Sequence, residues 1–189
     1  MRAFPAYFCA AANLAAILAL ATILAPGTTL IEEPARAAYV RENAGLWRAG
    51  WSLWVIAAVS LLVFYRWWAG RIGASVAPVA VAAAGFAVDL VAESLLIAVV
   101  PDRPDLARLS FVLTGGPANG LYTLAGALLS LRTPGMSGTF AIWSWAIWTL
   151  GAILSVVSVV EAPRAIAVAG AALFALFLPW CVAMGRRLG

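Results

Sequence analysis

The chain has 189 residues, of which 65% are hydrophobic and only 11% are charged, and its mean hydropathy is +0.99. A soluble domain carries about 25% charged residues, so these values exclude a water-soluble fold and predict an integral membrane protein of one domain, residues 1–189. The net charge is +4, but the basic residues are spread between apolar runs, which favours membrane topology over nucleic-acid binding.

Six stretches are apolar enough to cross a bilayer as helices, each needing about 20 residues. Segments rich in proline, glycine and charge, such as "AGRIGAS" and "PDRPD", separate them. The sequence therefore predicts an all-α membrane protein, a bundle of about six transmembrane helices. The expected spans are 6–25, 50–68, 76–100, 109–131, 139–160 and 165–184.

The loop between the first two predicted spans is long and has helical signals of its own. Glu32 and Glu33 precede Pro34, a combination typical of a helix start. Apolar residues such as Val40 and Trp47 can face the membrane while the charged residues face water. The pattern predicts a short interfacial helix, and the alternative is a lid over an outward cavity.

Charge predicts the orientation of the chain. An even number of spans puts both termini on one side, and the arginines tie at six on each side. Three arginines of the other side lie in the long loop, where they count for less. We therefore expect both termini in the cytoplasm.

The nine tryptophans cluster near the ends of predicted spans, and we expect most of them to be interfacial anchors. Trp148 lies deeper in the fifth predicted span and is a candidate for lining a cavity. Serines and Gly151 share its helix face, which favours close helix packing.

The segments "ENAGLWRAG", "LLVFYRWW", "NGLYTLAGALLSL" and "GRRLG" follow one another along nearly the whole chain. In this order of features the chain resembles an uncharacterised bacterial family of multi-pass membrane proteins, described only as a domain of unknown function. The resemblance implies a location in the bacterial plasma (inner) membrane. It implies no chemistry, cofactor or site residue.

Several chemistries lack the residues that they need. Without histidine, haem, copper and catalytic-triad sites lose their usual imidazole, and without lysine no Schiff base can form. Phosphate-binding and nucleophile-elbow motifs are absent. A metal would rest on Asp89 and Glu93 alone. We expect no cofactor, no metal and no catalytic residue, and an enzyme is the less favoured class.

Asp89 and Glu93 are the acids that fall within a predicted span. They are four residues apart and so share one face of the third predicted helix, about 6 Å apart along its axis. A charge at mid-membrane costs roughly 2.5–3.5 kcal/mol, and two carboxylates one turn apart repel. We therefore expect at least one to be protonated at neutral pH, with the pair titrating as a unit.

The fourth predicted span contains Gly115, Gly116 and Pro117, which weaken a helix at about the depth of the two acids. We expect a break there, with a half-helix N-terminus facing a carboxylate or ligand. Asn119 and Tyr122 follow, and could orient a ligand. The alternative is a simple kink, with the acids held by these polar groups as packing contacts.

The hypothesis that follows is a small transporter, permeation or binding protein. Its ligand-binding or proton-binding residues would be Asp89, Glu93, Asn119, Tyr122 and Trp148. The ligand would be a proton or a cationic or small amphiphilic molecule, and the partners would be the lipid bilayer and a second copy in a homodimer. The alternatives are a membrane-embedded lipid-modifying enzyme, and a non-catalytic subunit or scaffold of a membrane complex.

Overall fold

A computed structural model describes residues 3–28 and 32–189, and within these ranges all regular structure is helical. The long helices have the bounds α1 Phe4–Ala19, α3 Ala44–Ile72, α4 Ala77–Ala98, α6 Asn119–Arg132, α7 Gly138–Val159 and α8 Pro163–Leu188. The shorter ones are α2 Glu33–Glu42 and α5 Ala107–Leu113. π-helical turns follow α1 at Leu20–Leu24 and α5 at Thr114–Ala118, and short 3-10 turns cover Ala25–Gly27 and Pro104–Leu106.

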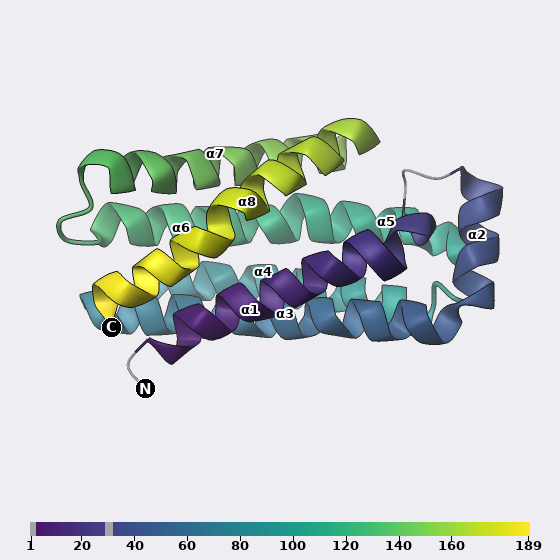
Figure 1. Cartoon of the computed structure of the whole chain (residues 1–189), viewed down its shortest axis with the longest axis horizontal. Coiled ribbons are helices and arrows are strands. Elements are labelled where there is room, and N and C mark those ends of the chain that lie inside the picture. The colour runs from purple at the N-terminus through teal and green to yellow at the C-terminus, as the bar shows by residue number, and fades with distance from the viewer. Residues whose placement is uncertain (1–2, 29–31) are drawn as a thin grey trace.

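Five of these helical segments are long and apolar enough to cross a membrane: Phe4–Gly27, α3, α4, α7 and α8. The chain is therefore an all-α, multi-pass membrane protein. The predicted fourth span differs, because it is divided into the 7 residues of α5, the 5 of the π-helical turn and the 14 of α6. No single α-helix of that region is long enough alone, although the three pieces together run the length of the bundle (Figure 1).

The long helices form a closed ring. Contacts join α1 to α3, α3 to α4, α4 to α6, α6 to α7, α7 to α8, and α8 back to α1 (Figure 1). Helices that follow one another along the chain are thus neighbours, as the short connections predict. Each helix has two ring neighbours, and α3 also contacts α6 across the ring.

The predicted interfacial helix corresponds to α2, which lies across one end of the bundle (Figure 1). The expectation that Val40 and Trp47 face the membrane is wrong. Val40 is 1% exposed and Trp47 is fully buried, because both pack inside the protein with Leu24. Tyr39 donates a hydrogen bond to the carbonyl of Ile23, a carbonyl within the π-helical turn that ends α1. This helix therefore closes the end of the bundle.

The other half of the bundle holds a core of aromatic rings in edge-to-face and stacked contact. Trp68 and Trp180 are fully buried and their ring centroids lie 5.4 Å apart, while Trp148 lies 5.3 Å from Trp180. The expectation that most tryptophans are interfacial anchors is therefore wrong for Trp68 and Trp180, and Trp148 packs in the same core. Burial of the large rings between α3, α7 and α8 is what positions these helices.

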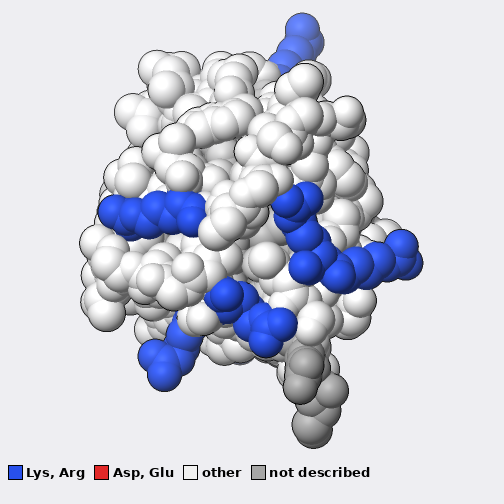
Figure 2. Space-filling view, turned by 90° about the vertical axis from the view of Figure 1, so that its left-hand side faces the viewer, with Lys and Arg blue, Asp and Glu red and all other residues white. Residues whose placement is uncertain are grey.

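The beginning of α1 and the end of α8 meet at one end of the bundle, which we call the arginine end. Its charged residues among those described are Arg66, Arg71, Arg132, Arg186 and Arg187. Figure 2 looks at this end and shows arginines and no acidic side chain. Acids and arginines are mixed at the opposite end.

Candidate functional site

Asp89 lies in α4 and is 7% exposed. Two hydroxyl groups of the neighbouring α5–α6 segment donate hydrogen bonds to its carboxyl group. Thr114 Oγ1 donates to Oδ1, and Tyr122 OH donates to Oδ2 over 3.3 Å. Asp89 thus has both oxygens hydrogen-bonded, which is how a buried carboxyl group is normally accommodated.

Tyr122 extends this network to a third helix. Its backbone carbonyl accepts a hydrogen bond of 3.0 Å from the hydroxyl of Tyr65, which lies in α3 and is 1% exposed. The side chains therefore connect α3, α6 and α4 through polar contacts inside an apolar bundle. A polar network of this kind fixes the relative position of the helices that carry it.

Glu93 has a different environment, although it lies one helical turn from Asp89. It is 1% exposed, and its Oε2 atom is buried without a hydrogen-bond partner among the described residues. Leaving a buried polar group unpaired costs about 1–3 kcal/mol, and more if it is charged. Such a group in a native structure indicates a proton, a water or a ligand that completes it.

The expected helix break at Gly115–Pro117 is wrong. The chain continues as a π-helical turn, in which the N–H of Asn119 bonds to the carbonyl of Thr114. The wider turn tolerates Pro117 without ending the helix. No half-helix N-terminus arises, so the contact with Asp89 is made by the Thr114 hydroxyl rather than by free backbone N–H groups.

Glycines of this turn and of α4 allow close packing on both sides of the turn. A Cβ added at Gly115 would lie 2.5 Å from the hydroxyl oxygen of Ser158 in α7. A Cβ added at Gly85 of α4 would lie 3.1 Å from the carbonyl oxygen of Ala118. The absence of side chains here brings the π-helical turn against α4 and α7, which sets Thr114 beside Asp89.

Asn119 and Trp148 do not join the acids. The Asn119 amide donates to Gly151 O and to Ser155 Oγ of α7, each over 2.8 Å. Trp148 Nε1 donates to Ser130 Oγ over 2.8 Å, within the aromatic core. The structure therefore brings together Asp89 and Tyr122, with Glu93 one turn away, and assigns the other two predicted site residues to helix packing.

Trp51 and Trp54, which the sequence predicts as interfacial anchors, lie at the depth of the acids. The bond from Trp47 Nε1 to Leu96 O, 2.7 Å long, sets the register of the antiparallel helices α3 and α4. We measure depth along the helix axes from this bond toward the middle of the bundle. Trp51 then lies at a depth of about 6 Å and Glu93 at about 4.5 Å. By the same rise, Trp54 and Asp89 are each about 10 Å deeper than that bond.

The indole N–H groups of Trp51 and Trp54 are buried and have no hydrogen-bond partner among the described residues. Their rings contact Phe111 of α5 and Phe174 of α8, at centroid distances of 5.8 and 5.9 Å. Phe111 is three residues before Thr114. By helical rise, Trp51 thus lies at about the depth of Glu93 and Trp54 at that of Asp89, and we call the depth range of these four residues the acid level.

The sequence offered one signal for this cluster. Trp47, Trp51 and Trp54 are spaced by four and three residues and so lie on one helix face. Near the end of a predicted span, such a stripe equally predicts anchors at the membrane surface. Thr114 gave no signal, because a lone threonine beside two glycines has no recognisable pattern.

Ion pairs occupy the end of the bundle opposite the arginine end. Arg103 donates to Asp105 at 2.9 Å, which lowers the pKa of that carboxyl group. The Arg108 guanidinium donates to Glu161, between the start of α5 and the α7–α8 turn, and lowers the pKa of Glu161. These side chains are exposed, so the pairs add little stability.

In the described part of the chain no group of three or more histidine, cysteine, aspartate and glutamate side chains could hold a metal ion. The arrangement at the acid level offers hydrogen bonding, proton binding and aromatic contact. In comparisons with models of protein families, with curated proteins and with solved structures, nothing matched this chain.

Proposed function

We propose that this chain is a small membrane transporter or binding protein in which Glu93 exchanges a proton for a cationic or small amphiphilic ligand. The observation that carries the proposal is the buried Oε2 atom of Glu93, which has no hydrogen-bond partner among the described residues. A structural carboxyl group in the same helix, Asp89, has both oxygens paired. The contrast favours Glu93 as the group that is free to bind.

The surroundings of Glu93 suit an organic cation. By helical rise, Trp51 lies at about the depth of Glu93 and Trp54 about one turn deeper. Aromatic faces attract a cation by about 0.5–2 kcal/mol per ring. A carboxylate supplies the counter-charge, and the two unpaired indole N–H groups could bind an acceptor on the same molecule. A proton alone would satisfy Glu93 but not the tryptophans.

The exchange follows from the cost of burying charge. When the site is empty, Glu93 carries a proton, because an ionised carboxyl group without a partner is expensive in a bilayer. A bound cation provides the partner, and Glu93 then releases its proton to the aqueous side. Asp89 keeps its hydrogen bonds to Thr114 and Tyr122 throughout and acts as a positioning residue.

The membrane arrangement belongs to the same proposal. The α5–α6 run, extended by its π-helical turn, would be the sixth span, so that both termini lie in the cytoplasm of a bacterium. π-Helical turns are frequent at functional sites, and this one contacts Asp89 directly. Six spans are few for a carrier, which makes a homodimer the candidate assembly.

The test is proton flux in liposomes that contain the purified protein and a trapped pH dye. An inward gradient of tetraethylammonium or tetraphenylphosphonium is imposed as the probe. The wild type is expected to release protons outward, and Glu93→Gln is expected to abolish the signal. Glu161→Gln, which removes a carboxyl group far from the site, is the matched control and should retain it.

A flux that is unchanged in Glu93→Gln and in the double variant Asp89→Asn with Glu93→Gln would overturn the proposal. A lipid that copurifies with the protein and is chemically altered by it would favour the enzyme instead. A protein that binds neither probe and carries no flux would favour the scaffold.

A further inference from the structure

A second candidate site lies at the arginine end, away from the acids. A shallow groove of about 640 Å³ runs between the first turns of α7 and the last turns of α8. Its lining is mostly apolar and aromatic and ends at two arginines: Phe140, Trp143, Pro179, Val182, Ala183, Arg186 and Arg187. This volume is within the range of about 300–1,000 Å³ that is typical of small-molecule sites.

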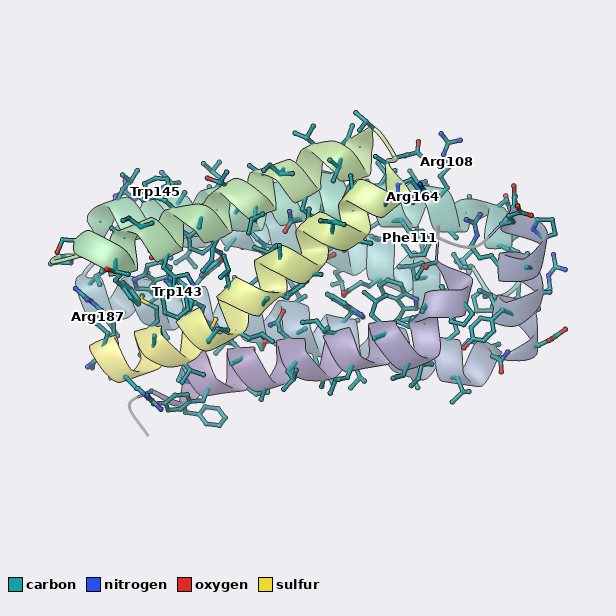
Figure 3. The ribbon with its side chains drawn as sticks, turned by 45° about the horizontal axis from the view of Figure 1, so that its top comes forward. Arg108, Phe111, Trp143, Trp145, Arg164 and Arg187 are labelled. Atoms are coloured by element: carbon teal, nitrogen blue, oxygen red, sulfur yellow. The ribbon has the colours of Figure 1, made fainter. Side chains whose placement is uncertain are left out.

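The groove is held in shape by contacts of its own walls. Trp143 Nε1 donates to the carbonyl of Leu176 over 3.1 Å, which ties α7 to α8 one turn before Pro179. Arg187 donates to the carbonyl of Gly135, and its guanidinium lies 5.1 Å from the centroid of the Phe140 ring. Figure 3 shows Trp143 and Arg187 together at this end of the bundle.

Arg186 is the second arginine of the groove lining, and the contacts of Arg187 do not involve it. It is exposed at the rim of the groove and makes no hydrogen bond or ion pair within residues 3–28 and 32–189. The arginine end has no acidic side chain to pair with it, as Figure 2 shows for the described residues in view. A guanidinium with no protein partner beside an apolar groove favours an amphiphilic ligand, with an anionic group and an apolar chain.

We propose that this groove binds an anionic phospholipid, with its phosphate on Arg186 and its acyl chain along Phe140, Trp143 and Val182. The helix ends that line the groove place it at the level where lipid headgroups meet the bilayer core, and basic groups near a membrane surface attract anionic lipids by about 1 kcal/mol each. The tryptophan at the rim suits the same interfacial level.

Other occupants fit less well. A free phosphate would contact Arg186 but leave the apolar lining exposed. A second copy of the chain, related by a two-fold axis, would bring Arg186 and Arg187 close to the same two arginines, and like charges repel. The charge of the groove therefore favours the lipid.

The experiment measures the lipid retained on the purified protein by native mass spectrometry, after titration with phosphatidylglycerol or phosphatidylcholine. The wild type is expected to keep one phosphatidylglycerol in preference to phosphatidylcholine. Arg186→Gln should weaken phosphatidylglycerol binding about fivefold, the effect of one basic group near the surface. Arg186→Lys, which keeps the charge, should restore most of it.

The matched control is Arg132→Gln, which removes an exposed arginine of the same end that lies outside the groove. It should leave lipid binding unchanged. Equal losses in Arg132→Gln and Arg186→Gln would overturn the proposal in favour of diffuse surface charge. Equal retention of both lipids, or a lipid-free dimer that protects Arg186, would overturn it as well. Because Glu93 plays no part, this outcome is independent of the flux test.

Discussion

The two halves of the bundle treat their buried polar groups differently. In the aromatic core of the arginine end, the N–H groups of Trp68, Trp148 and Trp180 each donate to a hydroxyl oxygen, of Thr133, Ser130 and Ser144 respectively. At the acid level, the N–H groups of Trp51 and Trp54 and one oxygen of Glu93 have no partner among the described residues.

This difference distinguishes polar groups that hold helices together from polar groups that are available to a ligand. Hydrogen bonds that are complete within the protein hold helices together and leave nothing for a ligand, whereas incomplete ones cost stability unless something else completes them. The same residue type, tryptophan, serves both purposes in one chain. Composition alone gives no means of distinguishing the two.

The largest effect is expected from Trp180→Ala, in the half of the bundle where the tryptophan N–H groups are hydrogen-bonded. This ring is fully buried against Phe64, Trp68 and Trp148, so its removal leaves a large cavity. We expect a loss of about 3–5 kcal/mol in the free energy of unfolding, measured by titration with a denaturing detergent in micelles. Trp145→Ala, which removes a 43% exposed ring from α7, should change it by less than about 0.5 kcal/mol.

The second prediction compares the two acids directly. Asp89→Leu leaves the hydroxyls of Thr114 and Tyr122 without an acceptor, and should lower the free energy of unfolding by about 1–3 kcal/mol. Glu93→Leu removes an unpaired buried oxygen and should leave the protein as stable or raise its melting temperature, while abolishing flux. Thermal unfolding in the same detergent measures both. If Glu93→Leu destabilises as much as Asp89→Leu, the acids are equivalent and the comparison fails.

The smallest effect is expected at the exposed pair of Arg108 and Glu161. The guanidinium lowers the pKa of this carboxyl group below its ordinary value of 4.5. A depressed pKa stabilises the fold above the unfolded-state value and loses that effect as the pH falls through the folded-state value. The melting temperature of Glu161→Gln should thus lie slightly below that of the wild type near pH 7, with the gap closing below about pH 4.5 and in high salt. A gap that persists in acid would show a contribution other than the ion pair.

Much of the fold could be predicted because apolar length is a local property. Four predicted spans correspond to α3, α4, α7 and α8, and the first to Phe4–Gly27. The breakers ended helices near the expected places, with α3 extending further at both ends than 50–68. The π-helical turn was not predicted, because Gly115, Gly116 and Pro117 are compatible with a break, a kink or a wider turn, and neighbouring helices decide among them.

The site was predicted in part. The shared face of Asp89 and Glu93 follows from their spacing of four, and Tyr122 does meet Asp89. Asn119 is only three residues before Tyr122, yet it faces α7. Which polar group meets which acid depends on the rotation of α6 about its own axis, and the packing of glycines against α4 and α7 sets that rotation.

Hydropathy and helical period act over a few residues, so the amino-acid sequence was enough to predict a helical membrane protein with two acids on one helix face. The two acids become different only when the helices pack together. Thr114 and Tyr122 approach Asp89 from a distant part of the chain, while Oε2 of Glu93 has no hydrogen-bond partner among the described residues. Trp51 and Trp54 reach the depths of the two acids through the register of α3 against α4. Such pairings arise between helices, so the spacing within any one helix does not contain them.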